Sequence, residues 1–559
     1  MTRATRVGAT RVDVAAAAAA DADVVGPDPA PRRALRGAVW IGSVRPQHAS
    51  RPVPTERADP PVSAKLPALA ELAARVGGEV VGDDRVTIGD LTHDSRQAGP
   101  GTAFACRPGA TADGHEFAGR AVTQGTPALV VERVLDQPAP QLRVPSVADA
   151  LGELAATVHG DPSHELRVLG ITGTNGKTTT AYLLEAALVQ AGCTPGLVGT
   201  VETRVRGHPV PGLRTTPEAT DLQRLLRRMA DDGVDSVAME VSSHGLSLGR
   251  VRGTRFAAVG FTNLSQDHLD FHADMEAYYR AKAALFDPAY APTGAVCVDD
   301  PYGRRLAEEA TIPVVRVSRD APEQVRASGV ELRPDGTRFR AWLGEASFDV
   351  TLRLPGPFNV TNALLALAIA DGAGVDPAAA ALGIAGITGV AGRMERVDEG
   401  QPFSVLVDYA HTPDSVAGVL EAARAFAPGT VIGVLGCGGD RDRAKRPLMG
   451  RALVAGSDYA ILTSDNPRSE DPRAILEAMA EGAREVAGHA WEIEPDRRAA
   501  IAKALEHAGP GDVVVIAGKG HEVGQEVEGV VAPFDDRAVA REILAGESPS
   551  CEERSGEGQ

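Results

Sequence analysis

The chain has 559 residues, of which 43% are hydrophobic and 24% charged, a composition typical of a globular protein. One hydrophobic core does not grow to this length, so we expect roughly three domains. The formal net charge of −18 argues against a nucleic-acid partner, because a field of this sign repels phosphates. No apolar window reaches the length of about 18 residues that a membrane-spanning helix needs. The longest apolar runs, such as Ala363–Ala370, have the length of a core helix.

The cysteines and the two chain ends indicate the cellular setting. The cysteines have neither metal-ligand spacing nor a disulfide pattern, so we expect a cytoplasmic protein. Residues 1–62 are rich in Ala, Arg and Pro, and acidic residues follow the run Ala15–Ala20 where a signal peptide needs a cleavage site. We expect a disordered extension there, or a mis-chosen start codon, and a disordered tail over 547–559. The five cysteines are Cys106, Cys193, Cys297, Cys437 and Cys551.

The globular pattern begins near Leu66. Residues 63–163 combine a predicted helix over Leu66–Val76 with short strands at Ala128–Glu132 and Gln141–Val144. This alternation is typical of a small, separate α/β domain.

A second predicted domain, residues 164–388, opens on the strongest motif of the chain. A predicted strand, Leu166–Leu169, leads into a glycine-rich turn within residues 170–180, and a predicted helix, Ala181–Leu188, follows. This strand–loop–helix context is the one in which backbone N–H groups hold phosphates. The sequence therefore predicts a nucleotide-binding loop in a mostly parallel sheet.

The end of the loop supplies the groups that a nucleoside triphosphate requires. Lys177 provides a positive charge for the β- and γ-phosphates, and the Thr178 hydroxyl can ligate Mg²⁺. The loop departs from the standard spacing, since Ile171 occupies the position of the first glycine.

Polar residues follow two further predicted strands, Ser236–Glu240 and Ala257–Thr262. Glu240 could give Mg²⁺ a second hard oxygen ligand, or it could simply end a surface strand. His268 could ligate a metal, although a lone histidine more often packs. Lys282, in a predicted helix over Tyr279–Phe286, would by itself be expected on a solvated face.

The third predicted domain, residues 389–546, has the pattern of a doubly wound, Rossmann-like α/β fold. Apolar strands at 404–407, 431–435, 459–463 and 513–517 alternate with amphipathic helices. In such sheets ligands bind beyond the carboxyl ends of the strands, so the residues directly after each strand are candidate site residues.

Taken together, the loop, Glu240, Asn263, the pair Asp267-His268 and the helix around Lys282 resemble the Mur ligases. This family adds amino acids to the UDP-linked peptidoglycan precursor at the expense of ATP. The resemblance implies a carbamylated Lys282 and two Mg²⁺ ions, with Lys177, Glu240, His268 and Lys282 as catalytic residues. The implied metal ligands are Thr178, Glu240, His268 and the Lys282 carbamate. The implied ATP-binding residues are Gly173, Thr174, Asn175, Gly176, Lys177, Thr178, Thr179, Asn263, Arg393 and Asp408.

The flanking domains resemble those of the family member that adds the third residue of the peptide. The turn Asp94-Ser95-Arg96 resembles part of a UDP-binding domain, and the segment Arg214–Glu218 resembles a substrate loop, although the family often has Asn where Arg214 stands. Both segments could equally be structural turns. The implied residues for the UDP-MurNAc-dipeptide are Ser95, Thr215, Thr216, Ser242 and Arg250.

In the third domain, the run Asp465–Arg468 follows a predicted strand. Arg468 carries a planar fork that can hold a carboxylate through two hydrogen bonds, and meso-diaminopimelate has a distal carboxylate that lysine lacks. Glu522 would face the distal ammonium. The resemblance thus implies a diaminopimelate site made of Asp465, Asn466, Pro467, Arg468, Gly518 and Glu522.

The resemblance implies an ADP-forming amide ligase that joins meso-diaminopimelate to UDP-MurNAc-L-Ala-D-Glu through an acyl phosphate. We expect these two substrates and ATP as partners, and a monomer that inserts into no membrane. The alternatives are a lysine-adding or other Mur or folylpolyglutamate-type ligase, and a nucleotide-binding scaffold without catalysis. A transport or motor ATPase fits less well, because a typical second Asp-ending strand is missing from the sequence.

Overall fold

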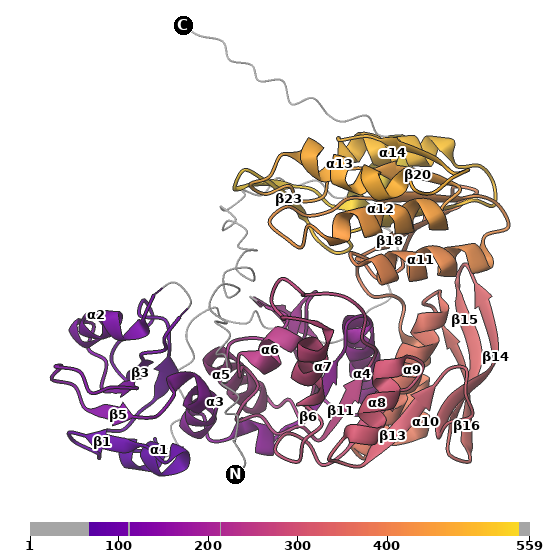
Figure 1. Cartoon of the computed structure of the whole chain (residues 1–559). Coiled ribbons are helices and arrows are strands. Elements are labelled where there is room, and N and C mark those ends of the chain that lie inside the picture. Colours follow the sequence, from indigo (N-terminus) through magenta and orange to yellow (C-terminus); the bar gives the residue numbers. More distant parts are fainter. Residues whose placement is uncertain (1–65, 110–111, 213, 547–559) are drawn as a thin grey trace, which may run out of the picture.

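The computed structural model describes residues 66–109, 112–212 and 214–546. Within these residues the strands form a five-stranded, an eleven-stranded and a six-stranded sheet and one two-stranded hairpin. Figure 1 shows that each large sheet and its helices form a lobe, and that the lobes follow in chain order. The expected disordered segments, 1–62 and 547–559, lie outside the described residues. None of the described helices combines the length and apolarity needed to cross a membrane.

The first sheet is parallel except for its edge strand β1, which pairs antiparallel with β5. Successive side chains of β4 point to opposite faces, so Val130 packs with α1 and α3 while Leu129 and Val131 pack with α2. In spatial order the strands are β1 (Glu79–Val81), β5 (Gln141–Arg143), β4 (Leu129–Val131), β3 (Thr102–Ala105) and β2 (Asp90–Thr92). The helices are α1 (Leu69–Val76), η1 (Gly114–Phe117), α2 (Ala118–Thr123) and α3 (Val147–Val158).

The central sheet follows the short helix η2 (Pro162–His164) and is parallel from β14 to β7, with antiparallel strands at both ends. In spatial order its strands are β16 (Ala346–Leu352), β15 (Gly336–Leu343), β14 (Val325–Arg333), β13 (Val314–Ser318), β12 (Gly294–Cys297), β11 (Ala258–Phe261), β6 (Arg167–Thr172), β10 (Ser236–Glu240), β7 (Pro195–Val198), β8 (Thr203–Val205) and β9 (His208–Val210).

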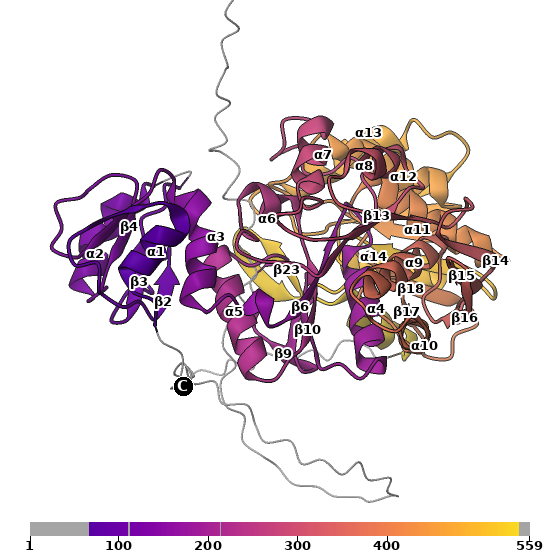
Figure 2. The same ribbon diagram turned by 90° about the horizontal axis from the view of Figure 1, so that it is seen from below.

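Helices cover both faces of the central sheet. Leu169 and Ile171 of β6 pack with α4, α9 and α10, whereas Val168 packs with the helices of the other face. Figures 1 and 2 both show α5 beside α3, where the first and central lobes meet. The helices are α4 (Lys177–Gln190), α5 (Ala219–Asp231), α6 (Ser243–Ser247), α7 (Met275–Ala283), α8 (Pro301–Glu309), α9 (Pro357–Gly372) and α10 (Pro377–Gly386).

Two features of the central lobe differ from the sequence analysis. The antiparallel strands β14, β15 and β16 were not predicted, although buried residues alternate with exposed ones in β15, as half-buried strands require. The helix expected over Tyr279–Phe286 instead begins at Met275, where the Asp274 side chain accepts a hydrogen bond from Ala277 N (2.8 Å), and ends at Ala283.

The third sheet has the predicted doubly wound arrangement. Leu406 packs with α11, α12 and α13 on one face, while Val405 and Val407 pack with α14 and α15 on the other. In spatial order its strands are β17 (Glu395–Val397), β18 (Ser404–Asp408), β22 (Val513–Ala517), β19 (Val431–Leu435), β20 (Tyr459–Leu462) and β21 (Ala490–Ile493). The helices are α11 (Pro413–Phe426), α12 (Lys445–Gly456), α13 (Pro472–Ala483), α14 (Arg497–His507) and α15 (Asp536–Leu544).

Two connections of the third lobe matter for the site. The chain passes once from the central to the third sheet, between α10 and β17. A hairpin of β23 (Gly524–Val527) and β24 (Val530–Pro533) extends beyond the carboxyl end of β22, and an isolated parallel bridge joins Val527 to Arg468.

Candidate active site

The loop between β6 and α4 is shaped by the neighbouring strand β11. A Cβ atom on Gly173, whose φ is 141°, would lie 1.8 Å from Thr262 Oγ1, so this position requires glycine. Asn263 Oδ1 accepts a hydrogen bond from Asn175 N (2.9 Å), and Asn263 Nδ2 donates one to Asn175 O (3.1 Å). Asn263 therefore holds the loop, while Thr179 lies buried in the first turn of α4.

Both lysines predicted to be catalytic meet at this loop. Lys177 Nζ donates hydrogen bonds to the carbonyl oxygens of Gly173 (3.0 Å) and Thr174 (2.8 Å). Lys282 Nζ donates to the same Gly173 oxygen (2.7 Å), and its side chain is buried against the ring of Tyr278 (4.6 Å from Nζ to the centroid). Burial lowers the pKa of Lys282 well below its usual value, and the nearby charge of Lys177 lowers it further. Lys282 thus favours the uncharged amine, the form that reacts with CO₂ to give a carbamate.

The remaining predicted metal ligands also lie at the carboxyl edge of the central sheet. Glu240, at the end of β10, accepts hydrogen bonds from Thr200 N (2.8 Å) and Thr200 Oγ1 (3.0 Å). Thr178 Oγ1 accepts a hydrogen bond from Arg393 Nη2 (3.0 Å), across the gap to the third lobe. The His268 ring lies 6.1 Å from the Tyr278 ring, centroid to centroid.

These residues form an oxygen-rich set rather than a cluster of ordinary metal ligands. Across the described residues, no group of three or more His, Cys, Asp and Glu side chains is arranged to hold a metal ion. A cation here would depend on a threonine hydroxyl, one carboxylate, the His268 ring and a lysine modified to a carbamate. Hydroxyl and carboxylate oxygens are the ligands that Mg²⁺ prefers, and burial lowers the pKa of His268 to about 3, which keeps its ring neutral.

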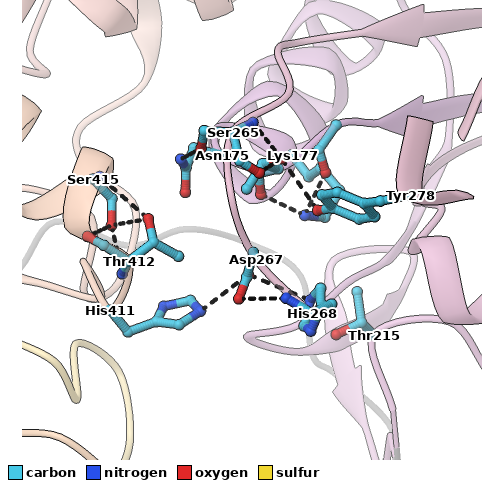
Figure 3. A network of polar contacts seen from close by, with 12 residues as sticks. Asn175, Lys177, Thr215, Ser265, Asp267, His268, Tyr278, His411, Thr412 and Ser415 are labelled. Atoms are coloured by element: carbon cyan, nitrogen blue, oxygen red, sulfur yellow. Dashed lines mark hydrogen bonds and ion pairs between the residues drawn. The ribbon is translucent and has the colours of Figure 1, made fainter. Parts of the chain in front are cut away.

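Asp267 connects the central lobe to the third lobe, and Figure 3 shows it between histidines of both. Its carboxylate lies 3.4 Å from His268 Nε2, 3.8 Å from His411 Nε2 and 4.0 Å from Lys445 Nζ. Burial lowers the pKa of His411 to about 4, so its ring is neutral at pH 7. The contacts of His411 and Lys445 with Asp267 were not predicted.

Arg393 and Asp408 are the two nucleotide contacts predicted from the third domain. Both carboxylate oxygens of Asp408 accept hydrogen bonds from backbone N–H groups. Asp408 Oδ2 accepts from Met394 N (2.7 Å) and Oδ1 from Ala410 N (2.8 Å). These bonds fix the turn that presents Arg393, whose guanidinium carbon lies 4.6 Å from the centroid of the Tyr409 ring. In this structure Asp408 orients the segment around Arg393.

The residues predicted to hold the dipeptide lie next to Glu240. Thr216 Oγ1 donates to Glu240 O (3.0 Å) and accepts from Ser242 N (3.0 Å), while Thr215 Oγ1 lies 3.0 Å from Thr200 Oγ1. Ser242 Oγ accepts from Gly245 N (3.0 Å) and caps α6. Arg250 Nη1 donates to Thr216 O (3.3 Å), so hydrogen bonds through Thr216 link Ser242 and Arg250 to the end of β10.

Glu218, which was not predicted as a site residue, forms ion pairs with arginines of the central and first lobes. Its carboxylate pairs with Arg250 (2.9 Å), Arg214 (3.5 Å) and Arg107 of the first lobe (3.0 Å). Ser95 lies farther into the first lobe, in the turn after β2. Arg214 stands only four residues before Glu218, but Arg250 and Arg107 are distant in the chain, so sequence spacing gave no signal for those two ion pairs.

The predicted diaminopimelate residues meet beyond β20 and β22. Asn466 Nδ2 donates to Glu522 Oε2 (2.9 Å), and Asp465 Oδ1 accepts from Asn466 N (2.7 Å). A Cβ atom on Gly518, whose φ is 110°, would lie 2.8 Å from Asp465 Oδ2, so glycine is needed for this approach.

Arg468 is fixed by both its backbone and its side chain. Its N–H donates to Glu526 O (3.0 Å) and its carbonyl accepts from Glu528 N (2.7 Å), which anchors the β23–β24 hairpin. Its Nη1 donates to Gly439 O (2.8 Å), and its Nε lies 3.4 Å from Glu526 Oε2. The side chain is 24% exposed, and Nη1 and Nε are the atoms that make these contacts. The Nη2 group of the guanidinium can therefore donate to a carboxylate.

Three α/β lobes, with a glycine-rich loop and two lysines at the carboxyl edge of the central sheet, form the architecture of a class of ATP-dependent ligases. Three family models match: "Mur ligase family, catalytic domain" over residues 87–159, "Mur ligase middle domain" over 171–370 and "Mur ligase, glutamate ligase domain" over 392–520. The chain belongs to the Mur ligase family.

The chain is also similar to individual ligases within this family. The chain is 49% identical, over 496 residues, to the UDP-N-acetylmuramoyl-L-alanyl-D-glutamate–2,6-diaminopimelate ligase of Streptomyces coelicolor, covering 87% of this chain and 97% of the relative. It is 46% identical over 517 residues to the ligase of the same name from Corynebacterium efficiens, covering 89% and 97%. A solved structure of a ligase of that name is 32% identical, with a TM-score of 0.63, covering 86% of this chain and 99% of that one. The MurF ligase of Thermotoga maritima in complex with ADP shares the fold (TM-score 0.56, 19% identity, covering 82% and 96%).

Proposed function

We propose that the protein joins meso-diaminopimelate to the γ-carboxylate of D-glutamate in UDP-MurNAc-L-Ala-D-Glu, with ATP cleaved to ADP and phosphate. The observation that carries this proposal is the anchored guanidinium of Arg468 at the carboxyl edge of the third sheet. It suits an amino acid with a second carboxylate, and the relatives named above are diaminopimelate ligases.

The reaction must activate a carboxylate, because its oxygen is a poor leaving group for an attacking amine. The carboxylate oxygen takes the γ-phosphoryl group of ATP, which gives an acyl phosphate and ADP. The neutral amine of diaminopimelate attacks the acyl carbon, and the tetrahedral intermediate expels phosphate and loses a proton. Lys177 offsets the charge of the phosphoryl group, so its role is electrostatic stabilisation and positioning.

The residues at the loop fit two Mg²⁺ ions. Thr178 and Glu240 would hold one ion, and His268 and the carbamate of Lys282 the other. Bound Mg²⁺ neutralises phosphate charge and aligns the reacting oxygens. The buried amine of Lys282, whose pKa burial lowers, supports this assignment, since carbamylation converts it to an anion that can ligate a cation.

The same residues give each substrate a separate place. The loop residues 173–179, with Asn263, Arg393 and Asp408, would contact or shape the ATP site. Thr215, Thr216, Ser242 and Arg250 would hold the dipeptide, and Ser95 the uridine end. Asp465, Asn466, Pro467, Arg468, Gly518 and Glu522 would hold diaminopimelate. We assign residues 63–163, 164–388 and 389–546 as the corresponding domains.

We further propose that the enzyme acts in the cytoplasm as a monomer and binds no nucleic acid. The free thiols of the described part of the chain, at Cys106, Cys193, Cys297 and Cys437, fit a reducing compartment. The net charge of −18 disfavours a nucleic-acid partner.

The test is ADP release by the purified protein with UDP-MurNAc-L-Ala-D-Glu, Mg²⁺ and ATP, with meso-diaminopimelate or L-lysine added in parallel. We expect turnover with diaminopimelate and little with lysine. A preference for lysine would keep the ligase but overturn the role of Arg468. No ADP release with either amino acid would favour a nucleotide-binding scaffold.

A further inference from the structure

A fully buried lysine lies beneath the proposed diaminopimelate site. The Lys519 side chain has 0% exposure, and it stands between Gly518 and Glu522 in the chain. Buried lysines are rare unless they are paired, because removing an ammonium group from water is costly. Its burial also means that a substrate would not contact it directly.

Lys519 reaches the proposed site through two neighbours. Its Nζ donates to Asn466 Oδ1 (3.0 Å) and to Glu522 Oε2 (3.1 Å). Asn466 Nδ2 donates to the same Glu522 oxygen (2.9 Å). Within the described residues both contacts of the Glu522 carboxylate go to Oε2, which leaves Oε1 for a substrate group.

The surroundings of Glu522 disfavour its negative charge, so the carboxylate needs a neighbouring cation. Burial and the charge of Asp465 raise the pKa of Glu522, and Lys519 opposes that rise. Burial alone would also raise the pKa of Asp465, but the charges of Lys519 and Arg497 lower it. Arg497 is already paired with Asp536 (2.7 Å), and Arg468 lies beside Glu526 (3.4 Å). Among the residues that the structure describes, Lys519 is therefore the cation in direct contact with Glu522.

We propose that Lys519 is a positioning residue that holds the Glu522 carboxylate through Oε2, so that the other carboxylate oxygen is free to receive the distal ammonium of the amino-acid substrate. Lys519 would thus set selectivity for an amine at the far end of the substrate, whereas Arg468 selects the distal carboxylate. This inference rests on the proposed function.

The test compares two substrates that differ only at that end: meso-diaminopimelate and 2-aminopimelate, which lacks the distal amine. In Lys519→Met we expect the KM for diaminopimelate to rise about tenfold or more, the loss typical of one charge-assisted hydrogen bond. We expect the KM, or the inhibition constant, for 2-aminopimelate and the KM for ATP to stay within about twofold. The matched control is Lys503→Met, whose lysine pairs with Glu494 (2.8 Å) and is 42% exposed.

A double-mutant cycle tests whether Lys519 acts through Glu522. If it does, Lys519→Met added to Glu522→Gln changes the KM for diaminopimelate by less than about twofold. This comparison also serves if Lys519→Met alone does not fold, because the double variant leaves no unpaired carboxylate from this pair.

Several results would overturn the inference. An unchanged KM for diaminopimelate in Lys519→Met would do so, as would equal losses for diaminopimelate and 2-aminopimelate, or multiplying effects in the cycle. In each case the wild type still couples diaminopimelate, so the proposed function stands. A wild type that does not use diaminopimelate overturns the proposed function, and this inference with it.

Discussion

At the scale of single residues, the carbonyl oxygen of Gly173 accepts hydrogen bonds from Lys282 Nζ (2.7 Å) and Lys177 Nζ (3.0 Å). Two ammonium groups on one oxygen repel each other, and burial further disfavours the charged forms. The side chain of Lys282 is the more deeply enclosed of the two. The shared carbonyl therefore favours one charged lysine for phosphate and one neutral amine for CO₂.

We expect Lys282→Gln to lower kcat about 100-fold or more, because the side chain can then form no carbamate to hold a cation. Wild-type protein in ¹³C-bicarbonate should show a carbamate NMR signal that the variant lacks. Lys503→Gln, at an exposed site, is the control and should keep both the signal and the activity. An active Lys282→Gln enzyme would contradict the assignment.

Arg468 should determine the choice between diaminopimelate and lysine. We expect Arg468→Ala to raise the KM for diaminopimelate by about tenfold or more, since a charged hydrogen-bonding pair is lost. Turnover with L-lysine, which has no distal carboxylate, should change little. Arg473→Ala, at an exposed position of α13, is the control. Equal effects on both amino acids would indicate damage to the β23–β24 hairpin rather than lost recognition.

At the scale of elements, the buried pair Arg497–Asp536 joins α14 to α15 (2.7 Å), and neither side chain is exposed. Arg497 also donates to Ser464 O (3.2 Å) and Ala517 O (2.9 Å), the residues directly before Asp465 and Gly518. The pair therefore fixes the strand ends that carry the proposed amino-acid site.

Breaking this pair should destabilise the third lobe strongly. We expect Asp536→Asn to cost about 3–5 kcal/mol of its unfolding free energy, because the Arg497 charge is left buried and unpaired. Hydrogen exchange of the β22 amides measures the change. Arg498→Ala, which removes a partly exposed pair with Glu542, should cost only about 0–1 kcal/mol. Similar losses in both variants would contradict the special role of the buried pair.

The contact between the first and central lobes should depend on pH. Asp90 of β2 accepts hydrogen bonds from Arg224 of α5 (3.0 and 3.1 Å), and its carboxylate lies 3.2 Å from His159 Nε2. Burial alone would raise the pKa of Asp90, but His159 and Arg224 lower it to about 2. Its stabilisation is therefore complete above the unfolded pKa of about 3.9 and is lost as the pH falls towards 2.

We expect Asp90→Asn to be less stable than the wild type by about 1–2 kcal/mol at pH 6. The difference should shrink as the pH approaches 3, because the wild-type unfolded state then takes up the proton. Urea unfolding at both pH values measures it. A difference that is constant with pH would mean that Asp90 acts through packing alone.

Local patterns of this chain predicted local features well. The apolar run Val431–Leu435 and the glycine-rich loop were identified because their signals lie within a few consecutive residues. The ion pair of Glu218 with Arg107 and the pairing of Asp267 with His411 could not be predicted, since each joins residues of two different lobes. The antiparallel strands at 325–352 were missed because short alternating segments also occur in surface loops.

At the scale of the whole molecule, the third lobe contacts the proposed nucleotide site. Arg393 Nη2 donates to Thr178 Oγ1 (3.0 Å), and Lys445 Nζ lies 4.0 Å from Asp267. A cation on Thr178 would repel the Arg393 guanidinium from this hydroxyl, which would free the guanidinium for phosphate oxygens. We therefore expect the binding of ATP and the position of the third lobe to be coupled.

We expect Arg393→Ala to raise the KM for ATP by about tenfold while the KM for diaminopimelate changes less than about twofold. Steady-state kinetics with each substrate varied in turn gives both values. Arg396→Ala, which removes a partly exposed pair with Asp398 at the start of the same lobe, is the control. A larger effect on diaminopimelate than on ATP would contradict the proposed nucleotide contact.

The single passage of the chain between α10 and β17 has a consequence for how such proteins can diversify. Among the described strands, none of the central sheet pairs with one of the third, so one recombination event in this short connection could exchange the entire amino-acid-selecting part. The phosphate-binding loop and its two lysines would be inherited unaltered. A new preference for the incoming amino acid could thus arise by exchange of a module, without reinvention of the energy-coupling chemistry.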